Sequence, residues 1–449
     1  MITPNSVKQS LRVDIAMTPL MAEALNKWSL MYVNTSPWLG GEIKSLNLAS
    51  SIAAEIARAV TIEMELDVTG SARADFLAAQ MIPVLNSIRT YTEYGAAKGG
   101  LWFKPYINGD EICVDYIQAD MGYPVAFDAN GNMTSAVFAD QKQVSNNFYT
   151  RLEYHAPMDS GYRITNTAFK STTRDMLGNQ VNLSELPEWA DIEPEAAILN
   201  IDRPLFAYFK MPFANAIDPT SPLGVSVYSR AVHLIEQADR MYSDFLWEFE
   251  SGKRALYTDT MAFGKDSAGK ALLPDKRLYR LLDLNSRVDG KGLFEDWSPT
   301  LREANILNGL DAILKRIEFT CGLAQGTISD PQSVALTATE IKMSKQRTYS
   351  TVVDTQKSLA DALNGLLYAM DVWATIGGLA PAGAYVATYT FDDSIVSDDD
   401  AQFNNDSAAV TLGVMPKFIF LMRNYGLDEE TAKQWVMNTA AQRIPIVRQ

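Results

Sequence analysis

Apolar residues recur at helical spacing in three segments near the N-terminus. These segments run from Pro19 to Tyr32, from Leu46 to Met64 and from Ala72 to Tyr94. The double glycine at 99–100 ends the helical pattern, because glycine destabilises a helix interior. We therefore expect three helices before this double glycine.

Short strand-like segments replace the helical pattern from Leu101 onward. An Asn-Gly dipeptide at 108–109 lies between LWFKPYI and EICVDYI, and another at 130–131 lies between YPVAFD and MTSAVFA. Asn-Gly predicts a tight hairpin turn because both turn residues need positive φ. Further strand-like segments surround Tyr149 and Ile164. The chain up to about residue 210 is therefore predicted to form one α+β unit.

Two amphipathic helices with a strand-like insert between them are predicted in the middle of the chain. The first runs from about Val225 to Glu250 and would be roughly 40 Å long. The insert, residues 251–297, contains the strand-like pieces RALYTDT and RLYRLLDL. The second helix begins at Ser298-Pro299, because proline suits a first helical turn, and it stops at Gly322.

A polar loop, AQGTISDPQSVAL, leads into the longest predicted helix. That helix opens with a capping box at residues 337–340 and could continue to Thr375, a length of roughly 55 Å. Its first half is polar, and its second half carries an apolar stripe made of Val352, Leu359, Leu363, Leu366, Met370 and Trp373. A helix this long with a polar half seldom packs inside one compact domain. It suggests an elongated molecule with neighbours.

The C-terminal part contains a strand-like segment, AYVATYTF, an aspartate cluster and a helical segment from Asp428. The cluster comprises Asp392, Asp393, Asp398, Asp399, Asp400 and Asp406. It is the one place where a divalent cation could bind, but it lacks the glycine and terminal glutamate of an EF-hand loop. A solvated acidic face or a helix N-terminus is therefore the favoured interpretation.

Composition and charge narrow the classes of function. The chain has 449 residues, 47% of them hydrophobic and 21% charged, an ordinary balance for a globular protein of two or three domains. The net charge of −15 argues against gripping nucleic acid over a broad surface. No apolar run is long enough to cross a bilayer and no signal peptide is evident, so we expect a cytosolic product. Cys113 and Cys321 are predicted to be free thiols.

Signatures of catalysis are missing from the sequence. It contains no phosphate-binding loop, no G-x-S-x-G elbow and no H-E-x-x-H pair. His155 and His233 are its only histidines, which makes histidine-based catalysis or metal binding a poor hypothesis. His233 is interpreted as packed or interfacial. We therefore expect no enzymatic activity, no metal and no cofactor.

The order of these elements resembles that of phage portal proteins. The helix, β insert, second helix, polar loop and long helix resemble the stem, clip, second stem helix, tunnel loop and wing helix of that family. The amino-acid sequence is similar too, especially to that of the branch found in long-tailed phages of Gram-positive bacteria. The similar segments cover residues 30 to about 375, and they are LNLASSIAAEIARAVTIEMEL, YGAAKGGLWFKPYINGDEICVDYIQAD, LFAYFKMPFANAIDPTSPLGVSVYSRA and LAQGTISDPQSVALTATEIKMSKQRTYSTV.

This resemblance implies an α+β, mainly helical portal fold. Its parts would be an α+β wing (1–224), a stem helix (225–250), a small α/β clip (251–298), a second stem helix (299–322), a tunnel loop (323–337), a long wing helix (338–375), and a wing end with a small helical crown (376–449). It also implies a ring, usually of twelve subunits, at the portal vertex of the virion capsid, assembled in the host cytoplasm.

The implied partners are further copies of the chain, double-stranded DNA in the channel, the terminase large subunit during packaging and a head–tail adaptor afterwards. Major capsid and scaffolding proteins would also contact the ring, and no membrane is involved. The tunnel loop would offer DNA the side chains of Gln325, Thr327, Ser329, Asp330, Gln332 and Ser333. None of these is positively charged, which suits a duplex that must slide, because each firm phosphate contact adds affinity.

Two questions stay open at the level of the sequence. Lys342, Lys345 and Arg347 could contact either phosphates or a neighbouring subunit. The competing functions are another oligomeric head–tail connector or pore, and a metal-dependent DNA-processing enzyme that uses the aspartates around Asp398 with Mg²⁺.

Overall fold

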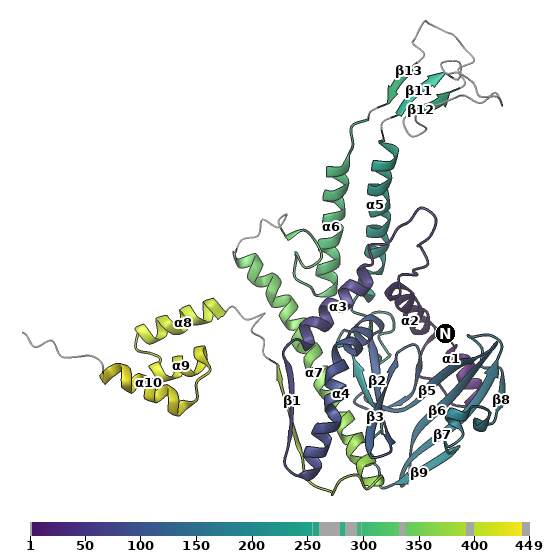
Figure 1. Ribbon diagram of the computed structural model, residues 1–449, viewed down its shortest axis with the longest axis vertical. Helices are drawn as coiled ribbons and strands as arrows, with labels where there is room; N and C mark the ends of the chain where they lie inside the picture. Colours follow the sequence, from purple (N-terminus) through teal and green to yellow (C-terminus); the bar gives the residue numbers. More distant parts are fainter. Residues whose placement is uncertain are drawn as a thin grey trace, which may run out of the picture. The chain divides into compact units, whose positions relative to one another are not determined.

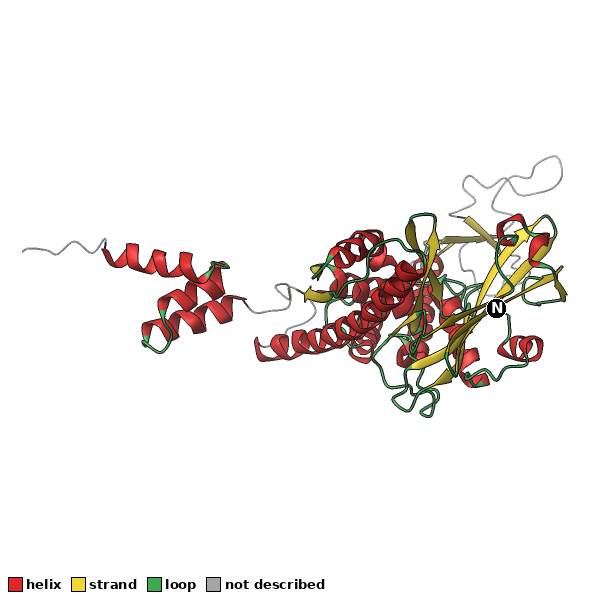
Figure 2. Ribbon diagram, turned by 90° about the horizontal axis from the view of Figure 1, so that it is seen from below, coloured by secondary structure: helices red, strands yellow, loops and turns green. Residues whose placement is uncertain are grey.

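The computed structural model describes residues 2–253, 255–259, 279–282, 294–297, 299–331, 338–391 and 399–441. The chain divides into two compact units, Met1–Thr390 and Phe391–Gln449. In the larger unit, most strands gather on one side and the long helices on the other (Figures 1 and 2). A helical hairpin projects from this body (Figure 1).

Four helices precede the first sheet. They are α1 (Pro4–Leu11), α2 (Pro19–Tyr32), α3 (Leu48–Thr61) and α4 (Ala72–Lys98). The side chains of Thr3 and Thr18 cap α1 and α2, and proline follows each cap, as the physics of free N–H groups at a helix start favours. The predicted helices near 19–32, 46–64 and 72–94 are confirmed, with α3 shorter because the strand β1 (Met64–Thr69) begins soon after it.

Two antiparallel sheets form the strand-rich side. The first has the order β10-β2-β3, from Ala207–Lys210, Gly100–Asn108 and Glu111–Gln118. The second has the order β4-β5-β6-β7-β8, from Gly122–Phe127, Met133–Val144, Asn147–Met158, Gly161–Ser171 and Asn179–Val181, and β9 (Glu195–Leu199) also pairs with β7. Short 3-10 turns at Leu183–Glu185 and Pro187–Trp189 lie between β8 and β9.

Both predicted hairpins form, but the turn residues differ from the prediction. Asn108 pairs with Glu111, so the first turn consists of Gly109 and Asp110, and Gly109 adopts a φ of 63°. The second hairpin is closed by the longer loop 128–132. There the carboxylate of Asp128 accepts the backbone N–H groups of Asn130 and Asn132 at 2.9 and 2.8 Å, which replaces a two-residue turn.

The projecting hairpin consists of α5 (Val232–Ser251) and α6 (Glu303–Cys321). Between them in the sequence, and at the free end of the hairpin in Figure 1, lie the short strands β11 (Ala255–Asp259), β12 (Tyr279–Leu282) and β13 (Phe294–Trp297). β11 pairs in parallel with β12 and antiparallel with β13. α5 and α6 approach each other closely at Gly309, where an added Cβ would lie 3.3 Å from the sulfur of Met241.

Both hairpin helices begin later than the sequence predicts. Val225–Tyr228 is buried, and the N–H of Val227 donates to the carbonyl of Ala96, which removes this stretch from the helix. A 3-10 turn (Ser229–Ala231) then leads into α5. α6 begins at Glu303 rather than at Pro299, because the backbone N–H of Arg302 is bound by the carboxylate of Glu248.

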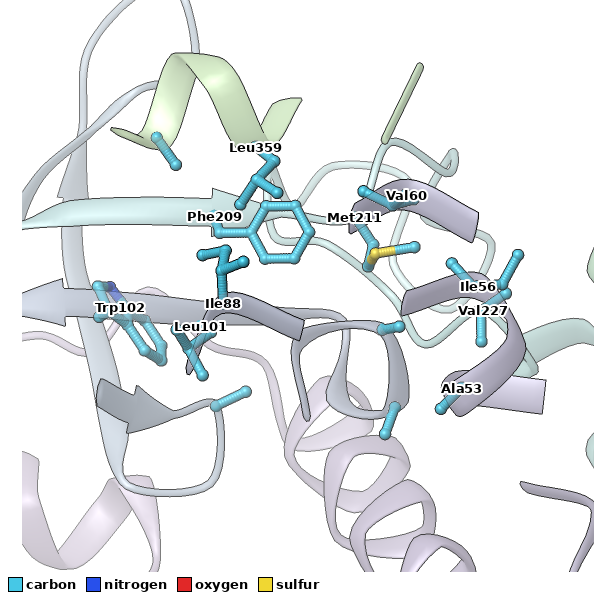
Figure 3. Close-up of a cluster of buried hydrophobic side chains, with 14 of the residues drawn as sticks. Ala53, Ile56, Val60, Ile88, Leu101, Trp102, Phe209, Met211, Val227 and Leu359 are labelled. Carbon is cyan, nitrogen blue, oxygen red and sulfur yellow. The ribbon is translucent and has the colours of Figure 1, made fainter. Parts of the chain in front are cut away.

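α7 (Ala338–Ile376) crosses the body of the larger unit and supplies much of its core. The predicted stripe is buried at Val352, Leu359, Leu363, Leu366 and Met370, and Trp373 is half-buried. Leu359 lies beside Phe209 of β10 (Figure 3). The strand β14 (Val386–Phe391) then pairs with β1. Among the described helices, none combines the length and the apolar character that a bilayer span requires.

The smaller unit contains α8 (Asp399–Thr411), α9 (Lys417–Tyr425) and α10 (Glu429–Ala441). Phe403 of α8 and Phe420 of α9 bring their ring centroids to 5.3 Å. Among the described side chains of this unit, Ala432 is the only fully buried apolar one. Leu412, Val414 and Trp435 are more than half exposed.

Candidate functional site

The predicted loop between the second hairpin helix and the long helix is described as far as residue 331. We call residues 322–331 the α6–α7 segment. α6 ends in a Schellman motif, in which the N–H of Leu323 donates to the carbonyl of Glu318 at 2.8 Å and Gly322 adopts a φ of 77°. A Cβ at Gly322 would lie 2.5 Å from the hydroxyl of Thr351 on α7, so the helices approach closely here.

Two acidic side chains of α6 hold the segment. The buried carboxylate of Glu318 accepts the backbone N–H groups of Ile328 and Ser329 at 2.6 and 2.9 Å, the hydroxyl of Ser329 at 2.8 Å and, at 3.3 Å, the N–H of Gly326. Two turns earlier on the helix, Asp311 accepts the N–H of Asp330 at 3.0 Å and forms an ion pair with Lys315 at 2.8 Å. The segment is therefore folded back onto α6.

The residues expected to face DNA divide into three groups. Gln325, Thr327 and Asp330 are exposed, and the hydroxyl of Thr327 donates to the carbonyl of Ala324 at 2.7 Å. The structure does not support an exposed Ser329: it is only 5% exposed because its hydroxyl is bound to Glu318. Gln332 and Ser333 lie outside the described residues, as does the cap at Thr337.

The three basic candidates lie on the N-terminal part of α7. Lys342 and Lys345 belong to that helix, and their side chains are outside the described part of the structure. The guanidinium of Arg347 lies 3.7 Å from the ring centroid of Phe319 and donates to the carbonyl of that residue at 3.5 Å. Arg347 therefore joins the start of α7 to the end of α6 within one chain.

The hairpin exposes large apolar side chains, mostly at the end of α5. They are Leu246, Trp247 and Phe249 on α5, and Leu307 and Phe319 on α6. Trp247 is 62% exposed. Next to them, Glu248 binds both the backbone and the guanidinium of Arg302, and this hydrogen bonding lowers the pKa of its carboxyl group.

Ionisable groups also cluster beneath the second sheet, along a cavity of about 670 Å³. Lys104 of β2 lies 2.6 Å from Glu153 of β6, and Arg151 and His155 contact the same carboxylate at 2.8 Å. Burial alone would raise the pKa of Glu153, but Lys104 and the other two partners hold it well below its usual range. Burial lowers the pKa of His155. This network joins the two sheets, and all of its charges are paired.

The aspartate cluster is divided. Asp392, Asp393 and Asp398 lie outside the described residues, and Asp399 and Asp400 begin α8. Asp406 is buried rather than solvated, because Asn424 and Arg423 of α9 donate to its carboxylate at 3.0 and 3.4 Å. Within the described ranges, no group of acidic, histidine or cysteine side chains could hold a metal ion. Burial raises the pKa of Cys321 to about 12, and both cysteines are free thiols.

Glu318 is the residue that reasoning from the sequence missed. A glutamate in the last turn of a helix opposes the negative end of the helix dipole, so its position carried a signal. The predicted polar loop begins only six residues further on. The acceptor role follows only from the three-dimensional turn, which aims three backbone N–H groups at one carboxylate.

Comparison with known proteins gives one family. The family described as "Phage portal protein, SPP1 Gp6-like" matches residues 86–442. No curated protein sequence matches the chain. Among solved structures, a chain of "Neck of native GTA particle computed with C12 symmetry" is similar at 12% identity and a TM-score of 0.43, covering 89% of this chain and 95% of that chain.

Proposed function

Because the chain belongs to the SPP1 Gp6-like family of phage portal proteins, we propose that it forms a ring at one capsid vertex through which DNA is packaged and ejected. The family is structural rather than catalytic. The match covers the strands from β2 to β14, the hairpin, the α6–α7 segment and α7. The proposed wing, clip, tunnel loop and crown keep the boundaries expected from the sequence, whereas the two proposed stem helices begin later, at Val232 and Glu303. The host branch remains a prediction.

The observation that carries the ring is the exposed apolar surface of the hairpin. Leu246, Trp247 and Phe249 are exposed close together near the end of α5, whereas other exposed apolar side chains of the larger unit, such as Leu20, Ile82 and Leu199, lie on different elements. Exposed apolar groups gathered on one element are typical of a surface that another protein covers. A second copy fits best, because a head-to-tail contact repeated around an axis closes a ring without free edges. The expected number of copies is twelve.

In such a ring, α5 and α6 would surround the channel and the α6–α7 segment would lie toward the bore. Residues 322–331 contain no lysine or arginine, and the chain carries a net charge of −15. The protein would therefore bind the DNA phosphates weakly and keep the duplex near the axis of the ring, which permits the DNA to slide. The clip strands β11–β13, at the free end of the hairpin, would bind the terminase large subunit and later the adaptor. Scaffolding and capsid proteins would contact the wing.

Ring formation is tested by electron microscopy of negatively stained protein and by sedimentation. We expect rings with a central hole from the parent, and mainly monomer from a Trp247→Gln, Leu307→Gln double variant with an unchanged melting temperature. Ile82→Gln is the matched control, since Ile82 is 58% exposed on α4, away from the hairpin. Only monomer from the parent at every salt concentration, or equal rings from the double variant, would contradict the proposal.

The channel assignment is tested by adding positive charge to the α6–α7 segment. Gln325→Lys with Thr327→Lys would place about 24 positive charges around the duplex in a twelve-subunit ring. We expect packaging to slow and to recover as salt is raised, because phosphate binding weakens with salt. Gln143→Lys with Asn146→Lys, in the β5–β6 hairpin, adds equal charge away from the segment. Equal packaging rates from intact rings of the loop variant and the parent would refute the assignment.

A further inference from the structure

The carboxylate of Glu318 occupies an unusual position for a charged side chain. It is fully buried in the last turn of α6, where the helix carbonyls present partial negative charge. In a Schellman ending, the residue at this position often packs an apolar side chain against the residue after the left-handed glycine. Here Leu323 is buried and Ile317 is the buried apolar neighbour in the sequence, so Glu318 is not needed for that contact. Its charge therefore requires another explanation.

The explanation lies in what the carboxylate binds. Both oxygens are used: Oε1 accepts from the N–H groups of Ile328 and Ser329, and Oε2 accepts from the Ser329 hydroxyl and the Gly326 N–H. A charge removed from water is costly unless hydrogen bonds compensate it, and charged acceptors form stronger bonds than neutral ones. The buried charge thus ties three backbone positions of the segment to one point on α6.

We propose that Glu318 is the positioning residue of the channel loop, fixing residues 326–329 to α6 so that this part of the loop and the helix move as one body. The inference rests on the proposed function, because it assumes that the α6–α7 segment faces the bore. The bond from the Asp330 N–H to Asp311 extends the same attachment by one residue along the segment. Together the two carboxylates determine where the exposed side chains of Gln325 and Thr327 lie relative to the stem.

This attachment has a consequence for DNA passage. A loop held only at its two ends would adjust independently in each subunit. A segment bonded along its length to α6 takes its place in the bore from the tilt of that helix. Any movement of the hairpin, at whose far end the clip strands lie, is therefore transmitted to the position of Thr327.

Hydrogen exchange of the purified full-length chain tests the attachment. In Glu318→Gln, which keeps the shape but replaces one acceptor oxygen by an NH₂ group, we expect the amides of Gly326, Ile328 and Ser329 to exchange at least about tenfold faster. Exchange within the body of α6, residues 303–317, should stay within about twofold of the parent. Glu250→Gln is the matched control, because it removes the same charge from an exposed site on α5. Ser329→Ala removes the hydroxyl's bond to Glu318 and the bond at 3.0 Å that this hydroxyl accepts from the Gly326 N–H, but it keeps both backbone bonds to Oε1. Exchange at Ile328 and Ser329 should therefore change less than in Glu318→Gln.

Packaging by intact rings tests the positioning role. We expect Glu318→Gln rings to package more slowly at every salt concentration, since the defect is geometric and not a phosphate contact. Uniform acceleration of exchange along α6, unchanged exchange at 326–329, or parent-like packaging would each overturn the inference. If only Glu318→Gln packages like the parent while the loop-lysine variant is slowed, the channel assignment stands and the positioning role fails. If both variants package like the parent, the channel assignment fails as well.

Discussion

Replacing Leu363 by aspartate tests the orientation of α7 in the core. Leu363 is fully buried within the main apolar cluster, near the middle of the helix. Losing its burial costs about 2 to 3 kcal/mol. Keeping the new carboxyl group protonated at pH 7, about three pH units above its ordinary range, costs about 4 kcal/mol more. The combined cost is on the order of 6 kcal/mol or more, close to the whole stability of many domains.

The pH dependence separates this mechanism from a simple loss of packing. The folded variant binds a proton that the unfolded chain has released, so its free energy of unfolding should fall by about 1.4 kcal/mol for each unit of rising pH. Leu363→Asn has a similar size and polarity but no proton to lose, and it should follow the pH dependence of the parent. Urea unfolding at several pH values between about 5 and 7, followed by circular dichroism, measures both variants. Equal pH dependence of the two variants, or parent-like stability of Leu363→Asp at pH 7, would show that this side chain does not point into the core.

Two further predictions follow from buried polar groups. Because burial lowers the pKa of His155, the unfolded chain takes up a proton before the folded chain does as pH falls below the ordinary histidine range. The parent should therefore lose stability in that range, and His155→Gln should lose less. Thermal unfolding from about pH 7.5 to 5.5 measures both. His233, the other histidine, is exposed. If His155→Gln loses as much stability as the parent over this pH range, burial of His155 is not the origin of the loss. Arg73, 1% exposed, donates to the carbonyls of Asp371, Ala380 and Pro381, so Arg73→Lys should lower the free energy of unfolding by roughly 1 to 3 kcal/mol although the charge is kept. Urea unfolding equal to that of the parent would show that the planar guanidinium is not required.

The order of the elements could be predicted from the sequence because it depends on local pattern. The helical periods of α2, α4 and α7 and the strand segments on both sides of the hairpin turns repeat over many residues, so single exceptions do not hide them. Pro83 lies inside α4 without ending it. The portal family was recognisable from the order of helix, insert, helix, polar loop and long helix, and the family match confirms it.

The helix starts could not be predicted from local pattern, since partners far away in the sequence decided them. Val225–Tyr228 has an apolar pattern that suits a helix, but its backbone bonds to Ala96 and its side chains enter the core. Pro299 suits a first helical turn, but Glu248 of the opposite helix binds the N–H of Arg302 and places the start there. The bond from Val227 also satisfies a backbone group that would otherwise be buried without a partner.

In the candidate site, too, some features were determined by the sequence and others only by the tertiary structure. Its composition was determined by the sequence alone: a segment without lysine or arginine between two helices, in a chain of net charge −15. Which of its side chains are accessible was decided only by the tertiary structure. Ser329 and Gln325 are alike in polarity, yet the turn of the backbone aims Ser329 at Glu318 and leaves Gln325 exposed. The reason is physical: burial of one carboxylate requires hydrogen-bond donors, and only the folded turn brings those donors to it.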